Sequence, residues 1–229
     1  TTGFMGRAYI NTIIRTVIST AANMLASYSV AFVLSKRDLP GRAPLTFFFV
    51  FTMYFSGGTI PAYILVKDLG LMNTMGALII PGIYGTWNMV MIRNYLATIP
   101  QDLTEAALID GAGPFKIMWL IIFPLATPIL ATVVLWNAVG SWNAWFDAMI
   151  YIQDNAKQVL QVILRRIVIQ EQIRAVMPEL GQVIAGQTDY IETSLKAATI
   201  ILTIGPIIFI YPFVQKYYIK GIVMGSLKG

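Results

Sequence analysis

Long apolar stretches, separated by short polar segments, dominate the chain. A helix needs about 20 predominantly apolar residues to cross a bilayer. Five stretches meet this length, at residues 10–34, 43–66, 74–96, 117–145 and 195–213. The pattern predicts an all-α, polytopic membrane protein in which residues 1–229 form a single transmembrane domain, a bundle of helices.

Composition supports a membrane protein and excludes several classes of function. Hydrophobic residues make up 57% of the chain and charged residues only 12%, about half the charged fraction of an average soluble domain. The net charge of +5 is spread out, so no nucleic-acid partner is expected. Cysteine and histidine are absent, which excludes disulfides, thiolate or histidine metal sites and histidine-based catalysis.

The Lys and Arg residues of the short loops predict the orientation, because cytoplasmic loops carry an excess of them. One side of the predicted bundle holds Lys36, Arg37, Arg42, Arg93, Lys116, Lys216, Lys220 and Lys228, whereas the short segments opposite hold only Arg7 and Lys67. The loop 98–116 and the tail 214–229 are therefore predicted to be cytoplasmic, and the segment 146–191 external. A cytoplasmic C-terminus after five spans puts Thr1 outside, so we expect a sixth span upstream.

The loop 98–116 carries a pattern that a simple connector does not need. Pro100 suits the first position of a helix, and Asp102 and Glu105 follow in its early turns, where the helix dipole favours acids. Gly111 is a natural stop. The pattern predicts a short, mostly polar helix over Gln101–Asp110. From these residues alone, an ordinary capped connector is the favoured interpretation.

The sequence of this loop resembles that of a known family. Glu105-Ala106-Ala107, then Asp110-Gly111-Ala112, with Pro124 downstream, resembles the signature loop of permease subunits in binding-protein-dependent ABC importers. The ending 220–229 is similar to the tails of maltose-type second permeases for carbohydrates. The stretches 52–58 and 142–146 look like the branch that handles oligosaccharides from polysaccharides, such as the alginate importer.

The resemblance implies partners and a mechanism. The chain would pair with a second permease subunit, two ATPase subunits and a soluble substrate-binding protein in the bacterial inner membrane, surrounded by lipid. Docking on an ATPase would involve Glu105, Ala106, Ala107, Asp110 and Gly111, and ATP with magnesium would sit on that partner. The chain itself has no P-loop sequence, so it is expected to be a transport subunit without cofactors, not an enzyme. Alternating access, driven by ATP, would move the sugar inward.

Polar and aromatic residues within the predicted spans are candidates for the sugar path. They are Tyr54, Asn88, Asn137, Ser141, Trp142 and Asn143. Hydrogen bonding between helices is the alternative role for the polar residues, and anchoring at the interface is the alternative for Trp142. Gly57-Gly58 and Pro61 predict a kink or an unwound turn in the second span.

Two further expectations concern charges and the external segment. Arg15 and Lys196 lie about a turn inside the predicted membrane edges, and snorkelling to the headgroups is the expected role, with a substrate contact as the alternative. Leu160, Ile163 and Ile167 recur at helical spacing, which predicts an amphipathic helix against the membrane or another span.

Two other functions remain open from the residues. An ion-coupled secondary transporter would be expected to show internal repeats and a buried carboxylate, neither of which the predicted spans contain. A membrane scaffold that moves nothing is the third possibility. The loop around Glu105 favours the importer permease over both.

Overall fold

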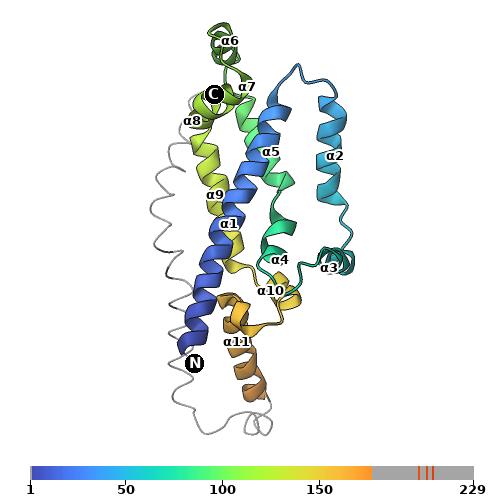
Figure 1. The fold of residues 1–229 in the computed structure, drawn as a ribbon, viewed down its shortest axis with the longest axis vertical. Coiled ribbons are helices and arrows are strands. Elements are labelled where there is room, and N and C mark those ends of the chain that lie inside the picture. The colour runs from blue at the N-terminus through green and yellow to red at the C-terminus, as the bar shows by residue number, and fades with distance from the viewer. Residues whose placement is uncertain (1, 177–200, 202–204, 206–207, 209–229) are drawn as a thin grey trace.

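A long central helix organises the protein. The computed structural model describes residues 2–176, 201, 205 and 208. Helix α1 (Thr2–Ser35) runs most of the length of the bundle (Figure 1). Its side chains divide into two faces, because Ile14, Val17 and Leu25 are exposed whereas Thr12 and Asn23 are buried. Such an arrangement suits lipid or an apolar partner on the outside and polar contacts within the bundle.

The second predicted span is broken. Helix α2 (Arg42–Tyr54) and helix α3 (Thr59–Asp68) meet at an angle of 109°. The break lies at the predicted glycine pair, where Gly58 adopts a φ of 85° that side-chain-bearing residues rarely take. The predicted kink is thus confirmed, although the bend is sharp enough to turn α3 sideways.

The next segment is also interrupted. Helix α4 (Gly76–Ile79) leads into a 3-10 turn (Ile80–Gly82) that contains Pro81, and helix α5 (Thr86–Leu96) then packs along α1. Proline cannot donate a backbone hydrogen bond, which favours the interruption.

The segment that carries the predicted signature loop follows α5. Helix α6 (Asp102–Ile109) projects at one end of the bundle (Figure 1), and a short helix, α7 (Pro114–Lys116), continues into a π-helical turn (Ile117–Ile122) and α8 (Phe123–Leu125). Helix α9 (Thr127–Asn143) then leaves at 81° to residues 114–125 and returns along α1.

The predicted fourth span is therefore bent near Ala126 and is not one straight helix. Two prolines flank the bend, at positions 124 and 128, and each removes a donor from the helical ladder. Tyr28 of α1 contacts the segment before the bend, where its hydroxyl donates to the carbonyl of Met118 in the π-helical turn.

The segment 146–191, predicted to be external, is helical in much of the part that the structure describes. It contains α10 (Phe146–Tyr151), a 3-10 turn (Asn155–Lys157) and α11 (Leu160–Val176). A helix is present at the predicted place, and it begins against another span, α1, where Leu160 and Ile163 are buried and the backbone N–H of Leu160 donates to Thr12 Oγ1 at 2.9 Å.

Two apolar clusters hold the bundle. One joins α1, α5, α9 and the π-helical turn and includes Tyr28, Met89, Ile117 and Val133; the other joins α3, α4, α10 and the start of α11 and includes Leu78 and Val162. Figure 1 places α6 and α7 at one end, the α6 end, and α3, α10 and α11 toward the other, the α10 end.

The described residues support the predicted all-α membrane bundle without fixing the number of spans. Within them, one helix, Met5–Ser35, is long and apolar enough to cross a bilayer alone, and up to three segments are if each bent pair forms a single span. The predicted span 195–213, apart from residues 201, 205 and 208, and the tail 214–229 lie outside the described residues, as does Lys196.

Candidate functional site

The helix predicted at the signature loop is present as α6, and most of its surface is free. Asp102 and Glu105 lie in its first turn, where the helix dipole favours them. Glu105 and Ala106 are exposed, and Ile109 is 86% exposed. Leu103 and Leu108 are exposed on the same helix, and a group of exposed apolar side chains on a projecting helix is suited to contact with another protein. Sequence reasoning did not single out Ile109, although an isoleucine beside Asp110 was a visible signal.

Glycine ends α6 as predicted. Gly111 has a φ of 77°, and the N–H groups of Gly111 and Ala112 donate to the carbonyls of Leu108 and Ala107 at 3.0 and 2.9 Å. This pair of bonds is a Schellman motif, in which a left-handed residue satisfies the last carbonyls of the helix. The turn therefore depends on glycine at this position and fixes the angle at which α6 leaves the bundle.

Ala107 is the exception among the residues assigned to the ATPase contact. It is 7% exposed and belongs to the apolar cluster that contains Ile117 and Met118. The neighbouring alanines therefore differ, because Ala107 packs into its own chain while Ala106 is exposed. A small residue at position 107 serves packing within the protein and leaves Ala106 and Glu105 to face a partner.

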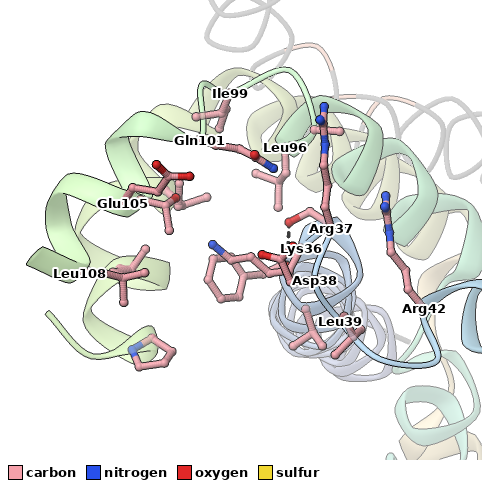
Figure 2. Close-up of a pocket in the computed structure, with 18 of the residues that line it drawn as sticks. Lys36, Arg37, Asp38, Leu39, Arg42, Leu96, Ile99, Gln101, Glu105 and Leu108 are labelled. Carbon is pink, nitrogen blue, oxygen red and sulfur yellow. Dashed lines mark hydrogen bonds between the residues drawn. The ribbon is translucent and has the colours of Figure 1, made fainter.

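A cavity of about 510 Å³ separates α6 from the end of α1. Figure 2 shows Glu105 and Leu108 on one wall and Lys36 on the opposite wall. The ammonium group of Lys36 lies 4.8 Å from the ring centre of Phe32, a cation–π contact. Burial lowers the pKa of Lys36, although Asp38 partly offsets this effect. The predicted basic turn after α1 thus faces the acidic helix across a gap.

Two candidates for the sugar path meet in the middle of the bundle, around a residue that the sequence reasoning missed. Asn23 of α1 accepts hydrogen bonds through Oδ1 from Asn88 Nδ2 at 2.8 Å and from Asn137 Nδ2 at 2.5 Å. Ser27 Oγ donates to the same oxygen at 3.3 Å. The four side chains, Asn23, Ser27, Asn88 and Asn137, are called the asparagine node below. Polar residues at positions 16, 20, 23 and 27, spaced by three and four, were the signal for it.

Hydrogen-bond logic fixes the orientation of the amides in the asparagine node. Asn23 Nδ2 donates to the carbonyl of Gly82 at 3.0 Å, and a carbonyl can only accept. Asn23 Oδ1 must therefore be the acceptor, so Asn88 and Asn137 present N–H groups to it. Gly85 makes room, because a Cβ there would lie 3.0 Å from Asn88 Nδ2 and 3.2 Å from Asn23 Nδ2. The node joins three helices, as the alternative interpretation proposed.

The remaining sugar-path candidates do not gather at the asparagine node. Tyr54 is 78% exposed at the end of α2, and Trp142 is buried with its ring edge-on to Tyr9 at 5.7 Å. Asn143 is exposed and accepts from Gln161 Nε2 at 3.4 Å. Ser141 is half-buried, and its hydroxyl has no hydrogen-bond partner among the described residues. The structure therefore divides the predicted path into separate places.

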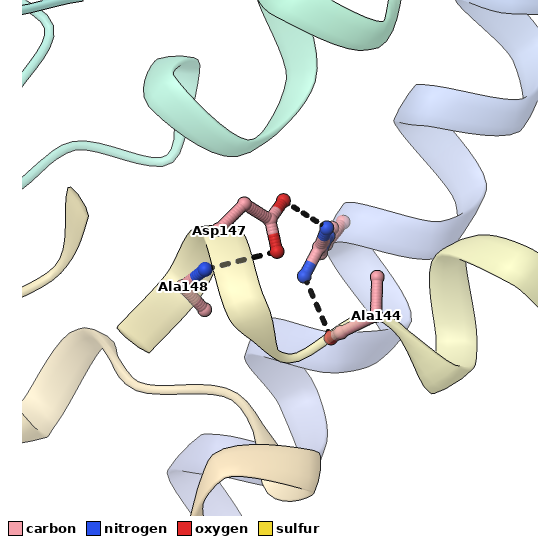
Figure 3. A network of polar contacts seen from close by, with 4 residues as sticks. Ala144, Asp147 and Ala148 are labelled. Atoms are coloured by element: carbon pink, nitrogen blue, oxygen red, sulfur yellow. Dashed lines mark hydrogen bonds and ion pairs between the residues drawn. The ribbon is translucent and has the colours of Figure 1, made fainter. Parts of the chain in front are cut away.

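Arg15 does not snorkel as expected. It is 4% exposed, and its Nη2 group forms an ion pair with Asp147 while Nη1 donates to the carbonyl of Ala144 at 3.0 Å. The other carboxylate oxygen of Asp147, Oδ1, accepts a hydrogen bond from the N–H of Ala148 at 2.9 Å, as Figure 3 shows. The expectation was wrong for a physical reason. Asp147, 132 positions away along the chain, offsets the free-energy cost of burying the Arg15 guanidinium.

Side chains also cross-link the α10 end to the rest of the bundle. Asn73, with a φ of 60°, accepts from the N–H groups of Gln153 and Asp154 through Oδ1, at 3.3 and 3.0 Å. Asn11 donates to the carbonyls of Ala156 and Gln158 at 3.0 and 3.1 Å. The turn 153–158 is thus tied to α1 on one side and to the α3–α4 connection on the other.

Comparisons with known proteins agree with this architecture. A sequence model of the family described as "binding-protein-dependent transport system inner membrane component" matches residues 2–223. The polygalacturonan/rhamnogalacturonan transport system permease protein YtcP of Bacillus subtilis is 42% identical over 215 residues, covering 93% of this chain and 74% of that protein. Protein LplC of the same organism is 39% identical over 214 residues, covering 93% and 71%.

A solved structure has the same fold. It is the crystal structure of a bacterial ABC transporter involved in the import of the acidic polysaccharide alginate, and one of its chains matches with a TM-score of 0.83. That match has 32% sequence identity and covers 94% of this chain and 75% of the other.

Proposed function

This chain belongs to the family of binding-protein-dependent transport system inner membrane components, and we propose from this premise that it is the permease subunit through which an ATP-driven importer moves an oligosaccharide inward. The membership makes it an inner-membrane permease of the ABC importer type. The names of its relatives place sugars and polysaccharide fragments foremost among candidate substrates.

The observation that carries the coupling mechanism is the projecting helix α6. Its exposed surface bears Glu105, Ala106 and Ile109, while Ala107 and the Schellman turn at Gly111 fix it to the bundle. A helix fixed to the bundle in this way can transmit the movement of a bound partner to the membrane helices. We propose that an ATPase subunit, with ATP and magnesium, binds α6 and drives alternating access.

The proposed assembly follows from the same premise. A second permease, two ATPase subunits and a soluble substrate-binding protein complete the transporter. The α6 end and the C-terminus face the cytoplasm, and the α10 end faces the binding protein. We propose a fragment of a polysaccharide as the cargo, with alginate as one candidate and polygalacturonan, which the name of YtcP indicates for that relative, as another.

Neighbouring alanines offer a matched test. Ala106→Leu enlarges the exposed face of α6, whereas Ala107→Leu enlarges a side chain in the core. We expect Ala106→Leu to leave the thermal stability of the isolated chain unchanged and to reduce recovery of the ATPase complex and sugar uptake. Ala107→Leu should lower the stability of the isolated chain by about 1–3 kcal/mol, as overpacked cores do.

Uptake should be measured with labelled alginate trisaccharide, polygalacturonan trisaccharide and raffinose, in cells that hold the complete transporter. Charge reversal by Glu105→Lys is expected to act like Ala106→Leu. Normal complex recovery and normal uptake in both variants would remove the coupling role of α6. If the wild-type transporter takes up none of the three sugars, the proposed cargo is contradicted.

A further inference from the structure

An open groove of about 410 Å³ lies at the α10 end, away from α6. One wall is the break between α2 and α3, with Ser56, Gly57, Gly58 and Thr59; the other is α10, with Asp147 and aromatic residues. The volume falls in the range of about 300–1,000 Å³ that is usual for small-molecule sites. None of the residues predicted for the sugar path lines this groove.

The first wall offers backbone donors. The first N–H groups of a helix lack partners within it; in α3 these are the groups of Thr59 and Ile60, since Pro61 has none, and Gly58 at the cap position supplies no side chain to bind them. Unwound backbone at membrane depth is tolerated only where protein or water covers it. The hydroxyl-bearing residues Ser56 and Thr59 are exposed at the same place. This wall is therefore polar, open and built from an irregular backbone.

The second wall offers a fixed acceptor. Asp147 is bound from behind, because Arg15 pairs with Oδ2 and the N–H of Ala148 donates to Oδ1. The Arg15 side chain is 5% exposed and that of Asp147 is 30% exposed, so the carboxylate reaches the groove while the guanidinium does not. A carboxylate has about four lone-pair sites, and each oxygen of Asp147 keeps one for a ligand.

Aromatic rings complete the second wall. Phe146 is 48% exposed, and Tyr151 is held by the nearly parallel ring of Tyr63, with ring centres 6.3 Å apart. A pocket with apolar or aromatic walls and a few fixed polar groups orients a ligand that has both kinds of surface. A pyranose ring has them, since hydroxyls lie around its edge and C–H groups on its faces.

We propose that this groove binds one pyranose ring of the transported oligosaccharide, with two neighbouring hydroxyls donating to Asp147 and a ring face against Phe146. Arg15 is the positioning residue, which holds the carboxylate without touching the sugar. The inference rests on the proposed function, and it adds a first contact for the sugar at the end of the permease opposite α6.

Transport tests the groove with a matched pair on α10. Phe146→Ala removes an aromatic wall, whereas Met149→Ala shortens a side chain that is equally exposed, at 49%, but does not line the groove. At saturating loaded binding protein, we expect Phe146→Ala to lower uptake per ATP hydrolysed roughly fivefold, and Met149→Ala to leave it unchanged. Asp147→Asn should lower it about tenfold, the loss of hydrogen bonds to a charged group.

Chemical protection tests occupancy without relying on the Asp147 variant. The natural chain has no cysteine, so Thr59→Cys places a single thiol in the groove and Leu69→Cys a control thiol at the far end of α3. An impermeant maleimide should label both. Binding protein loaded with the transported trisaccharide, in the presence of vanadate and ATP, should slow labelling of Thr59→Cys at least fivefold, and unloaded binding protein should not.

The outcomes separate this inference from the proposed function. Sugar uptake by the wild type, combined with equal labelling in the loaded and unloaded states and full uptake by Phe146→Ala, would overturn the groove and leave the importer intact. Equal protection by loaded and unloaded binding protein would assign the groove to contact with that protein and would also overturn the proposal. Absence of uptake by the wild type would instead contradict the proposed function.

Discussion

Helix α6 and the polar face of α1, formed by Thr12, Arg15, Asn23 and Ser27, are built on opposite principles. The α6 helix presents its polar and charged side chains outward, and its end is held by backbone hydrogen bonds. The polar face of α1 is buried, and its side chains bind groups up to 148 positions away. One region is open to a partner, while Thr12, Arg15, Asn23 and Ser27 in the other form hydrogen bonds within the chain.

The difference shows how one chain can both hold its shape and respond to a partner. Breaking a contact in the buried region leaves a polar group without a substitute, since neither lipid nor protein replaces it. Changing an exposed residue on α6 leaves water to replace what is lost. Stability should therefore depend on the polar face of α1, and partner binding on α6, in the order of effects that follows.

The largest effect is expected for Arg15→Met. The change leaves Asp147 without its partner at a partly buried site, and breaking such a pair typically costs about 3–5 kcal/mol. The isolated chain in detergent should unfold at a clearly lower temperature and yield less folded protein. The double variant Arg15→Met with Asp147→Leu should recover much of the loss, because no charge is left buried. A double variant as unstable as the single one would refute the pairing explanation.

A smaller effect is expected for Gly85→Ala. The added methyl group would press on the amides of Asn23 and Asn88, and crowding of this kind costs about 1–3 kcal/mol. Gly140→Ala is the control, because nothing lies within 4 Å of a Cβ at that position of α9. Gly85→Ala should unfold at a lower temperature than Gly140→Ala. Equal unfolding temperatures would show that the asparagine node tolerates displacement.

Gly111→Ala should act at the other region with a cost of about 1–2 kcal/mol, because the left-handed backbone there penalises any side chain. The control is Gly113→Ala, since Gly113 has a φ of −70° and open space around it. Because the Schellman turn is local, Gly111→Ala should clearly reduce recovery of the ATPase complex and lower the unfolding temperature only slightly. A large fall in unfolding temperature with normal recovery of the complex would show that Gly111 acts on stability, as the buried contacts do.

Glu105→Gln should have the smallest effect on stability. Surface substitutions away from special features usually change it by less than about 0.5 kcal/mol, and Glu105 is exposed and without an ion-pair partner among the described residues. Unfolding temperature should match the wild type while stimulation of the ATPase by loaded binding protein falls. Substantial destabilisation would show that the helix is fixed by its acid as well as by its turn.

Local features were predicted from the sequence because a few neighbouring residues decide them. The span of α6, its stop at Gly111 and the break at Gly57-Gly58 each depend on residues within a turn or two. Caps, dipole effects and glycine conformations act at that range. The motif around Glu105 likewise indicated the family, which the comparisons confirmed.

Only the tertiary structure decided which distant groups meet. The sequence could not bring Arg15 to Asp147 or place Asn23 between Asn88 and Asn137, and it assigned Ala107 to a partner although the core contains it. In a membrane, apolar side chains face lipid as readily as protein, so the hydrophobic pattern determines that a helix spans but not which face is inside. Packing of the helices against one another made that choice.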